Sequence, residues 1–300
     1  MFRSLITIYL VLLFPFSLLA AESSQILASI KPLQSIIANL TKDVDNNIGL
    51  IIDKNESLHN YHLKPTKIKQ IHESKIVILI DRNFEIFLDK IIYNLNDKNH
   101  LIIEVAKLPN VRLRGMHDHD HNHNHEHGHS HDYHIWLDVS IVKIFSTELV
   151  KLLSKENPQY KKQYEKNLKD FLLKLDNLDK NIKAKIGVAR NKNFIVTHNA
   201  YDYFISRYGL NSPDSITIDH DHNIGARTFL ELQEKMKNNN VSCIFEEPQF
   251  ESNIMRKLKE NTNIKLGVLD AEWGPNDASI EDNYFEMMNS LMENFIKCLS

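Results

Sequence analysis

The sequence predicts an α/β protein of two lobes, each a roughly four-stranded parallel sheet with flanking helices, joined by one long rigid helix. Three observations lead to this prediction. Short runs of β-branched and other apolar residues recur at helix-length spacing in the first half of the chain, the same rhythm returns in the second half, and a long amphipathic stretch separates them. Mostly apolar strands that alternate with helices are typical of parallel sheets covered on both faces.

Residues 1–21 are predicted to be a signal peptide. One basic residue, Arg3, precedes a single apolar run, and two alanines lead into a polar stretch. The run is short and contains Pro15, which argues against a membrane span, although an uncleaved anchor is the alternative. No cysteine that could carry a lipid lies nearby. We therefore expect an exported protein that is cleaved near Ala21.

The first lobe is expected at 22–156. Within it, residues 115–132 read GMHDHDHNHNHEHGHSHD and have no apolar face at the helix or the strand period. Burial therefore cannot offset the entropy of ordering this segment, and we expect a disordered, histidine-rich loop. The strands of this lobe are predicted at the apolar runs 26–30, 48–52, 76–80 and 101–105.

Nine of the 16 histidines lie between His117 and His134. Weak capture of divalent metal by neutral imidazoles is the favoured role for this loop, and a pH-dependent charge switch or a plain polar linker are the alternatives. Residues 125–129 spell HExxH. We reject the zinc-protease interpretation because that motif needs a stable helix to place both imidazoles on one face, and a segment rich in Gly, Asn and Asp does not favour one.

The linking helix is predicted at 157–186. Asn157 is a suitable N-cap and Pro158 is suited to the first helical position. Apolar residues then recur at spacings of three and four as far as Ile182, which indicates a helix of about seven turns. A helix of this length is too long for an ordinary crossover, and this disfavours the alternative of one large sheet.

The second lobe is expected at 187–300. It contains the only cysteines, Cys243 and Cys298. In an exported chain we expect a disulfide between them, with two free buried thiols as the alternative. The strands of this lobe are predicted at the apolar runs 194–197, 215–218, 241–245 and 264–269.

The composition excludes several functional classes. With 36 basic and 39 acidic residues the net charge is -3, so the chain has no surplus of positive charge for nucleic acid. Its eight glycines form neither GxGxxG nor GxxxxGK[ST], so the usual dinucleotide and nucleoside triphosphate cradles are missing.

The candidate site is predicted at the carboxyl ends of the strands, where open parallel sheets bind ligands. His59 follows the second run, His134 follows the fourth run and its loop, and His198 ends the first run of the second lobe. Glu247 and Asp270 follow the third and fourth runs of that lobe. A lone histidine in such a place is more often structural, but several converging ones indicate a metal site.

Several motifs surround these residues along the chain. They are ASIKPL at 28–33, HNYHLKP at 59–65, HIWLD at 134–138, residues 197–210, EPQF at 247–250, and Leu269 with Asp270. Together they resemble the periplasmic solute-binding proteins of ABC transporters that take up zinc or manganese, and their zinc branch in particular. The resemblance covers nearly the whole mature chain. It implies two lobes joined by a rigid helix, a metal site in the cleft, a periplasmic location and delivery to a membrane permease.

The resemblance implies that His59, His134 and His198 are metal ligands, and three imidazoles with one carboxylate or water suit tetrahedral Zn²⁺. A manganese site would prefer oxygen donors. We expect Asp270 as the fourth ligand, with Glu56 or water as alternatives, because Leu58 stands where relatives often have Pro or Glu. Since only neutral imidazole binds metal, affinity should weaken as pH falls through about 6.5, the value of an unperturbed histidine.

The expected function is capture of Zn²⁺ and its delivery to an ABC permease by a monomer that binds no nucleic acid and catalyses no reaction. A zinc hydrolase is one alternative, with Glu247 as its candidate base, although a structural carboxylate is favoured there. A secreted metal buffer or an adhesin without a transporter is another. His220 and His222 could form a second, weaker site or a solvated turn. Surface or hydrogen-bonded roles are expected for His62, His72 and His100.

Overall fold

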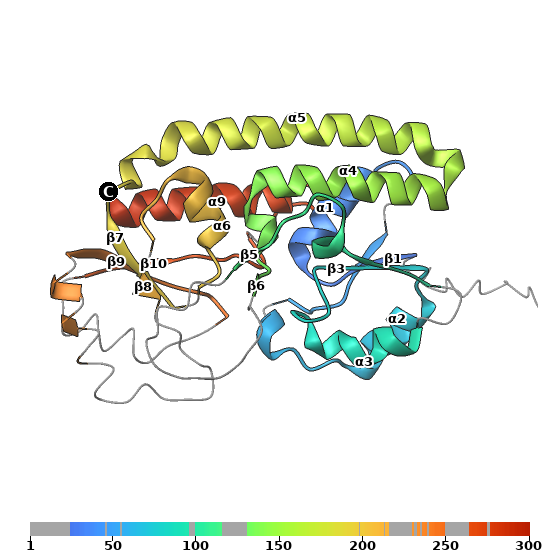
Figure 1. Cartoon of the computed structure of the whole chain (residues 1–300), viewed down its shortest axis with the longest axis horizontal. Coiled ribbons are helices and arrows are strands. Elements are labelled where there is room, and N and C mark those ends of the chain that lie inside the picture. The colour runs from blue at the N-terminus through green and yellow to red at the C-terminus, as the bar shows by residue number, and fades with distance from the viewer. Residues whose placement is uncertain are drawn as a thin grey trace, which may run out of the picture.

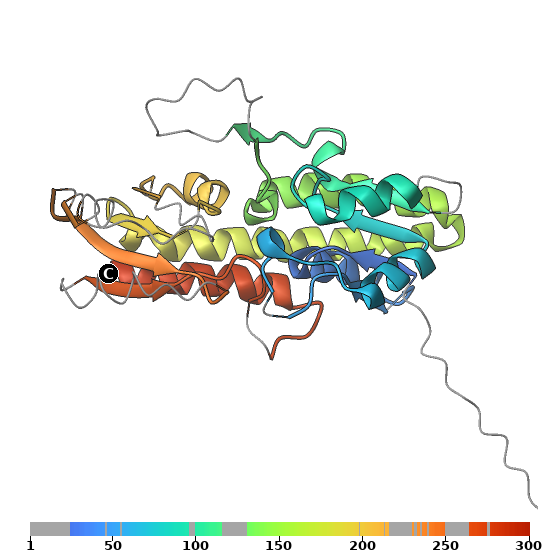
Figure 2. The ribbon, with the colours of Figure 1, turned by 90° about the horizontal axis from the view of Figure 1, so that it is seen from below.

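The computed structural model describes residues 25–45, 47–54, 56–95, 100–115, 131–197, 199–212, 214–215, 230, 233–234, 236–238, 240–249, 264–274 and 277–300. Two sheets lie side by side, and one long helix, α5 (Lys161–Lys185), runs along both of them (Figure 1). The same arrangement is visible from below, where α5 extends behind both lobes (Figure 2).

The first lobe is a parallel sheet of four strands in the order β2-β1-β3-β4. The central strands β1 and β3 are completely buried, as expected for apolar strands covered on both faces. Helices α2 and α3 cover one face, and α1 and α4 lie on the other (Figure 1). The elements are β1 (Ile26–Ala28), α1 (Lys31–Thr41), β2 (Ile48–Leu50), α2 (Pro65–Glu73), β3 (Ile76–Leu79), α3 (Ile86–Leu95), β4 (Leu101–Glu104) and α4 (Val139–Glu156).

Short elements at the edge of this lobe carry candidate ligands. The 3-10 turn η1 (Leu58–Asn60) follows β2, and η3 (Ile135–Leu137) precedes α4. Two-residue strands β5 (Arg114–Gly115) and β6 (His131–Asp132) pair antiparallel at the two ends of the predicted histidine-rich loop. The residues between them, 116–130, lie outside the described residues.

The second lobe repeats the design with a parallel sheet in the order β10-β9-β7-β8. Strand β8 begins near the predicted run at 215–218, of which only residue 215 is described. The elements are β7 (Asn193–Val196), α6 (Asp202–Tyr208), β8 (Asp214–Ser215), β9 (Val241–Glu246), β10 (Lys265–Val268) and α9 (Asn283–Leu299).

The predicted long helix is confirmed, with a local difference at its start. Asn157 and Pro158 begin a 3-10 turn, η4 (Pro158–Tyr160), before α5 proper begins at Lys161. The buried residues of α5 recur at three and four, which is the apolar stripe that faces the lobes. They are Tyr164, Asn167, Phe171, Leu175, Leu178, Asp179 and Ile182.

The last helix, α9, belongs to the second sheet but also contacts the first lobe. The Ser35 hydroxyl of α1 accepts a hydrogen bond from the Tyr284 N–H at 3.0 Å. At its other end α9 is held by the predicted disulfide, since Cys298 is bonded to Cys243 of β9. The chain therefore crosses between the lobes at α5 and again before α9. The boundaries of the first lobe, the linking helix and the second lobe, at 22–156, 157–186 and 187–300, stay predictions.

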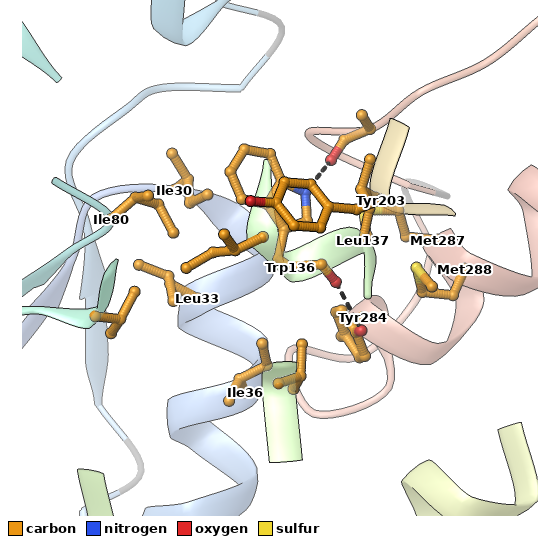
Figure 3. Packing of buried hydrophobic residues seen from close by; sticks show 14 of the residues in the cluster. Ile30, Leu33, Ile36, Ile80, Trp136, Leu137, Tyr203, Tyr284, Met287 and Met288 are labelled. Atoms are coloured by element: carbon orange, nitrogen blue, oxygen red, sulfur yellow. Dashed lines mark hydrogen bonds between the residues drawn. The ribbon is translucent and has the colours of Figure 1, made fainter. Parts of the chain in front are cut away.

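The two lobes meet at a buried tryptophan, Trp136 of η3 (Figure 3). Its indole N–H donates to the carbonyl of Ala271 at 2.8 Å, and its own carbonyl accepts from the Tyr284 hydroxyl at 2.8 Å. The hydroxyl of Tyr203, on α6, donates to the backbone carbonyl of Asp132 at 2.8 Å. Hydrogen bonds from three separate elements thus fix the first lobe on the second.

The predicted fold class is confirmed: two four-stranded parallel sheets with flanking helices are joined by a long helix. Within the described part of the chain, no helix combines the length and the apolar character that a membrane crossing requires.

Candidate metal centre

His59 lies on η1, the first helical turn after β2. Ser57 caps this turn, because its hydroxyl oxygen accepts a hydrogen bond from the His59 N–H at 3.3 Å. The side chain of His59 is exposed, and its ring lies 5.5 Å from the ring of Phe84, edge to face. The turn therefore presents an accessible imidazole at the edge of the sheet, where the sequence predicts a ligand.

His134 precedes η3 and is held by a carboxylate two residues before it. Asp132 Oδ1 accepts hydrogen bonds from the His134 backbone N–H at 2.9 Å and from Nδ1 at 2.8 Å, and both side chains are buried. A carboxylate that binds one ring N–H keeps the lone pair on the other nitrogen, which is how metal-binding imidazoles are usually oriented. Asp132 was not predicted, although a carboxylate two residues before a ligand was visible in the sequence.

The structure brings His59 and His134 together, although they are 75 positions apart in the chain. Their ring centroids are 5.7 Å apart. Phe84 lies against both rings, 5.5 Å and 5.2 Å from them, and Trp136 lies 5.2 Å from His134. The ring of Phe84 thus packs against both imidazoles. No pattern in the sequence predicted that Phe84 would lie there.

Asp270 follows β10 at the edge of the second sheet. Its Oδ1 accepts three hydrogen bonds at 3.0 Å, from Gln249 Nε2 and from the backbone N–H groups of Glu272 and Trp273. None of the described residues bonds to Oδ2. Burial raises the pKa of this carboxyl, and the nearby Glu247 adds to the shift. A cation close to this carboxylate would offset the penalty of a buried negative charge.

Two further carboxylates are buried close to Asp270. Glu247 Oε1 lies 2.7 Å from the hydroxyl of Tyr201, which also lies 3.1 Å from the carbonyl of Leu269. Burial raises the pKa of Glu272 well above its ordinary value, and the charges of Glu247 and Asp270 raise it further. Three acidic groups in low-dielectric surroundings raise the cost of one another's negative charge. Sequence reasoning missed Glu272, because it neither ends a strand nor belongs to a motif.

The structure gives less information on the other two predicted ligands, His198 and the alternative Glu56. His198, which follows the end of β7, lies outside the described residues. The carboxylate of Glu56, the alternative fourth ligand, accepts a hydrogen bond from Lys64 Nζ at 2.9 Å. Among the residues that the structure describes, no group of three or more His, Cys, Asp and Glu side chains converges as a metal site would require. The four-ligand set therefore stays a prediction.

Surface or hydrogen-bonded roles are predicted for His62, His72 and His100. His62 and His72 are exposed, and the Nδ1 of His100 lies 2.7 Å from the carbonyl of Ser74. His220 and His222 fall outside the described residues, so the prediction of a second site there stays untested.

A cavity of about 280 Å³ lies between the lobes but contains none of the predicted ligands. Its lining includes three lysines, Lys31, Lys54 and Lys67, together with Asp53 and Trp273. Burial lowers the pKa of Lys31, and Lys54 adds to the effect. A cavity with this excess of ammonium groups repels a divalent cation and does not suit a metal site.

Comparisons with known proteins agree on one family. The model of the family described as ZnuA, zinc-uptake complex component A, periplasmic, matches residues 26–298. The high-affinity zinc uptake system protein ZnuA of Brucella suis is 32% identical over 319 residues, which cover 95% of this chain and 94% of the relative. The protein of the same name from Haemophilus influenzae is 28% identical, covering 93% of this chain and 94% of its own.

Solved structures show the same fold. A crystal structure of ZnuA has a TM-score of 0.78 at 24% identity and covers 92% of this chain and 98% of its own. The Zn(II)-bound ZnuA-like domain of AdcA from Streptococcus pneumoniae has a TM-score of 0.73 at 22% identity, with coverages of 91% and 98%. FpvC from Pseudomonas aeruginosa, in complex with Mn²⁺, has a TM-score of 0.77 at 20% identity, with coverages of 93% and 99%.

Proposed function

Because this chain belongs to the family of periplasmic zinc-uptake components described as ZnuA, we propose that it binds Zn²⁺ between its lobes and delivers the ion to the permease of an ABC transporter. Membership of this family also supports a periplasmic location. We further propose that residues 1–21 are a signal peptide that is removed on export. The ion is cargo that is bound and released, and no chemical step is required of the protein.

The proposed ligands are His59, His134, His198 and Asp270. The observation that carries the proposal is the pair of imidazoles whose ring centroids lie 5.7 Å apart, with the second held on Asp132. Two imidazoles from the first lobe, with a third imidazole and a carboxylate from the second, would make a four-ligand set typical of zinc. Because the set is divided between the lobes, binding would hold them together, and separation of the lobes would release the ion.

The hydrogen bonding of Glu247, the candidate base of a hydrolase, supports a protein that binds zinc without catalysing a reaction. Its Oε1 is engaged by the hydroxyl of Tyr201 at 2.7 Å. Burial raises the pKa of Tyr201 well above its ordinary value, and the charge of Glu247 raises it further, so this phenol keeps its proton and remains a donor. A carboxylate held in this way ties β9 to the start of α6 and is poorly placed to take a proton from water.

The histidine-rich loop predicted at 115–132 is proposed to raise the local concentration of zinc near the site. Its residues 116–130 fall outside the described residues, but its ends belong to the β5 and β6 pair, and β6 stops two residues before His134. Neutral imidazoles on a polar segment would bind divalent metal weakly and exchange it quickly. The partners proposed are thus zinc and a permease, and the protein is proposed to act as a monomer.

The decisive experiment is the metal content of the exported protein purified without added metal. We expect about one zinc per chain in the wild type, as one four-ligand site requires, and loss of zinc in His59→Ala, His134→Ala and His198→Ala. His72→Ala, an exposed histidine of α2, is the matched control and should retain zinc. Manganese or iron as the main occupant, or ligand variants that keep their zinc, would contradict the assignment.

Delivery to a permease requires its own test. A strain that lacks the gene should grow poorly when zinc is withheld, and the wild-type protein should restore growth while His134→Ala should not. A secreted buffer or an adhesin would bind zinc equally well in the purified state but would leave growth of that strain unchanged.

A further inference from the structure

Residues 270–273, which we call the latch segment, join the second lobe to the first beside the predicted ligands. The segment follows β10 and begins with Asp270. Each of its next three residues makes a hydrogen bond to the first lobe, either to the turn that precedes His59 or to the turn that follows His134. The latch segment therefore touches both ligand-bearing turns of the opposite lobe.

Two of these bonds come from indoles. The chain has two tryptophans, and both donate an indole N–H across the boundary between the lobes. Trp136 of the first lobe donates to the carbonyl of Ala271 at 2.8 Å (Figure 3). Trp273 of the second lobe donates to the carbonyl of Glu56 at 3.2 Å. Neither bond can form unless the lobes are closed on one another.

The third contact is a carboxylate. Glu272 Oε2 accepts the backbone N–H of Leu58 at 3.2 Å, and Oε1 accepts the hydroxyl of Ser57 at 3.3 Å. The same Ser57 hydroxyl oxygen accepts the N–H of His59. A single side chain of the second lobe thus holds the two residues that precede His59 and reaches the cap of the turn on which it lies.

Burial raises the free-energy cost of breaking these hydrogen bonds. Glu272 is only 7% exposed and Leu58 is 1% exposed. A buried N–H or hydroxyl that loses its acceptor has no water to replace it, and such a loss costs more than a typical hydrogen bond contributes. The turn that carries His59 therefore has one favoured position in the closed protein, and the carboxylate of Glu272 defines it.

We propose that Glu272 is a positioning residue for zinc: through Ser57 and Leu58 it fixes the turn of His59 relative to the second lobe, in which Asp270 is a predicted ligand. The proposal rests on the proposed function, since it concerns the same site. It assigns to Glu272 hydrogen bonds to the opposite lobe, not a bond to the metal. Opening of the lobes must break these bonds together with the two indole bonds, and this slows the release of zinc.

Two substitutions separate hydrogen bonding from charge. Glu272→Gln keeps an acceptor for the Leu58 N–H and offers an amide to Ser57, whereas Glu272→Met fills a similar volume without either bond. The measurement is the rate of zinc loss to an excess of chelator from protein loaded with one equivalent of zinc. We expect Glu272→Met to release zinc about tenfold faster or more, because buried donors are left without partners. Glu272→Gln should stay close to the wild type.

The matched control is Glu286→Gln, which removes an exposed carboxylate in the first turn of α9. It should release zinc at the wild-type rate. A Glu272→Gln protein as fast as Glu272→Met would overturn the proposal, because charge or direct coordination would then be what matters. A Glu272→Met protein with the wild-type rate would overturn it as well.

Tryptophan emission provides a second readout that does not need metal. In metal-free Glu272→Met the indole of Trp273 should meet water, and emission should shift to longer wavelength, while Glu272→Gln should show no shift. An unshifted Glu272→Met protein would refute the latch. A wild type that binds no zinc would refute the proposed function instead, and the emission of the metal-free variants would still decide whether Glu272 holds the lobes together.

Discussion

Replacement of Asp132 by asparagine is expected to weaken zinc binding by about 10- to 100-fold. Asp132 Oδ1 accepts both the backbone N–H and the Nδ1–H of His134, at 2.9 Å and 2.8 Å. The side chains are 4% and 7% exposed, so water competes little for these bonds. A hydrogen bond to a charged group contributes about 1.5 to 3 kcal/mol net. Because each 1.4 kcal/mol is about a factor of ten in Kd, loss of the charged partner gives the stated range.

The physical reason is the choice of ring nitrogen that carries the proton. The carboxylate of Asp132 can only accept, so it keeps the proton of His134 on Nδ1 and leaves Nε2 as the donor to metal. An asparagine amide keeps an oxygen for both N–H groups but lacks the negative charge, so it holds the proton on Nδ1 less strongly and the form with the proton on Nε2 becomes more populated. Part of the protein would then present a protonated nitrogen to the incoming ion.

The assay is a competition titration against a chelator of known zinc affinity, with circular dichroism to check folding. Asp89→Asn is the matched control, since it removes an exposed carboxylate from α3 and changes the net charge equally. An unchanged Kd in Asp132→Asn would refute the reasoning. An equal loss of affinity in Asp89→Asn would refute it too, because long-range charge and not the hydrogen bond would then be responsible.

Three further outcomes concern stability. Burial raises the pKa of Glu85 from 4.5 to about 8, so between pH 4.5 and about 8 the folded state holds a proton that the unfolded state has lost. The free energy of unfolding of the metal-free protein should therefore fall as pH rises through that window. Thermal melts at a series of pH values should show this fall for the wild type and a flatter dependence for Glu85→Gln. Arg207→Met leaves Asp138, which is largely buried, without its ion pair to Arg207, and leaves Asp179 paired with Lys183 alone. We expect a loss of about 3 kcal/mol in urea unfolding, and a change below about 0.5 kcal/mol would contradict this. Cys298→Ser removes the disulfide to β9 and should lower the free energy of unfolding by about 2 to 4 kcal/mol. Chemical reduction of the wild type should cause the same loss of stability. Reduction of the variant should cause no further loss.

Much of the fold follows from local patterns in the sequence. The apolar runs mark strands because a strand in a parallel sheet must be apolar on both faces, and β1 and β3 are completely buried. The spacing of three and four from Tyr164 to Ile182 predicts α5, since one face of that helix packs on the lobes. The beginnings of elements are less well predicted, because Pro158 is equally compatible with the 3-10 turn that forms there.

The candidate site was predicted residue by residue, but its organisation was not. His59, His134 and Asp270 were recognised by their place after strands and by motifs of the family that they resemble. Their partners had no such signal: Asp132 was overlooked inside a histidine-rich stretch, Phe84 ends no strand, and Glu272 belongs to no motif. A residue that acts through a hydrogen bond across the protein carries no spacing that can be read along the chain.

The sequence by itself determined the class of fold, the positions of most strands, the long helix, the cysteine pair and the type of metal chemistry. These depend on periodicity, composition and the identity of donor atoms, all of which are local properties of the chain. Only the tertiary structure decided that Glu272 bonds to Ser57 and that both indoles cross between the lobes. Those contacts join residues up to 217 positions apart, and such pairs are brought together by the packing of two whole sheets and not by any preference of the residues themselves.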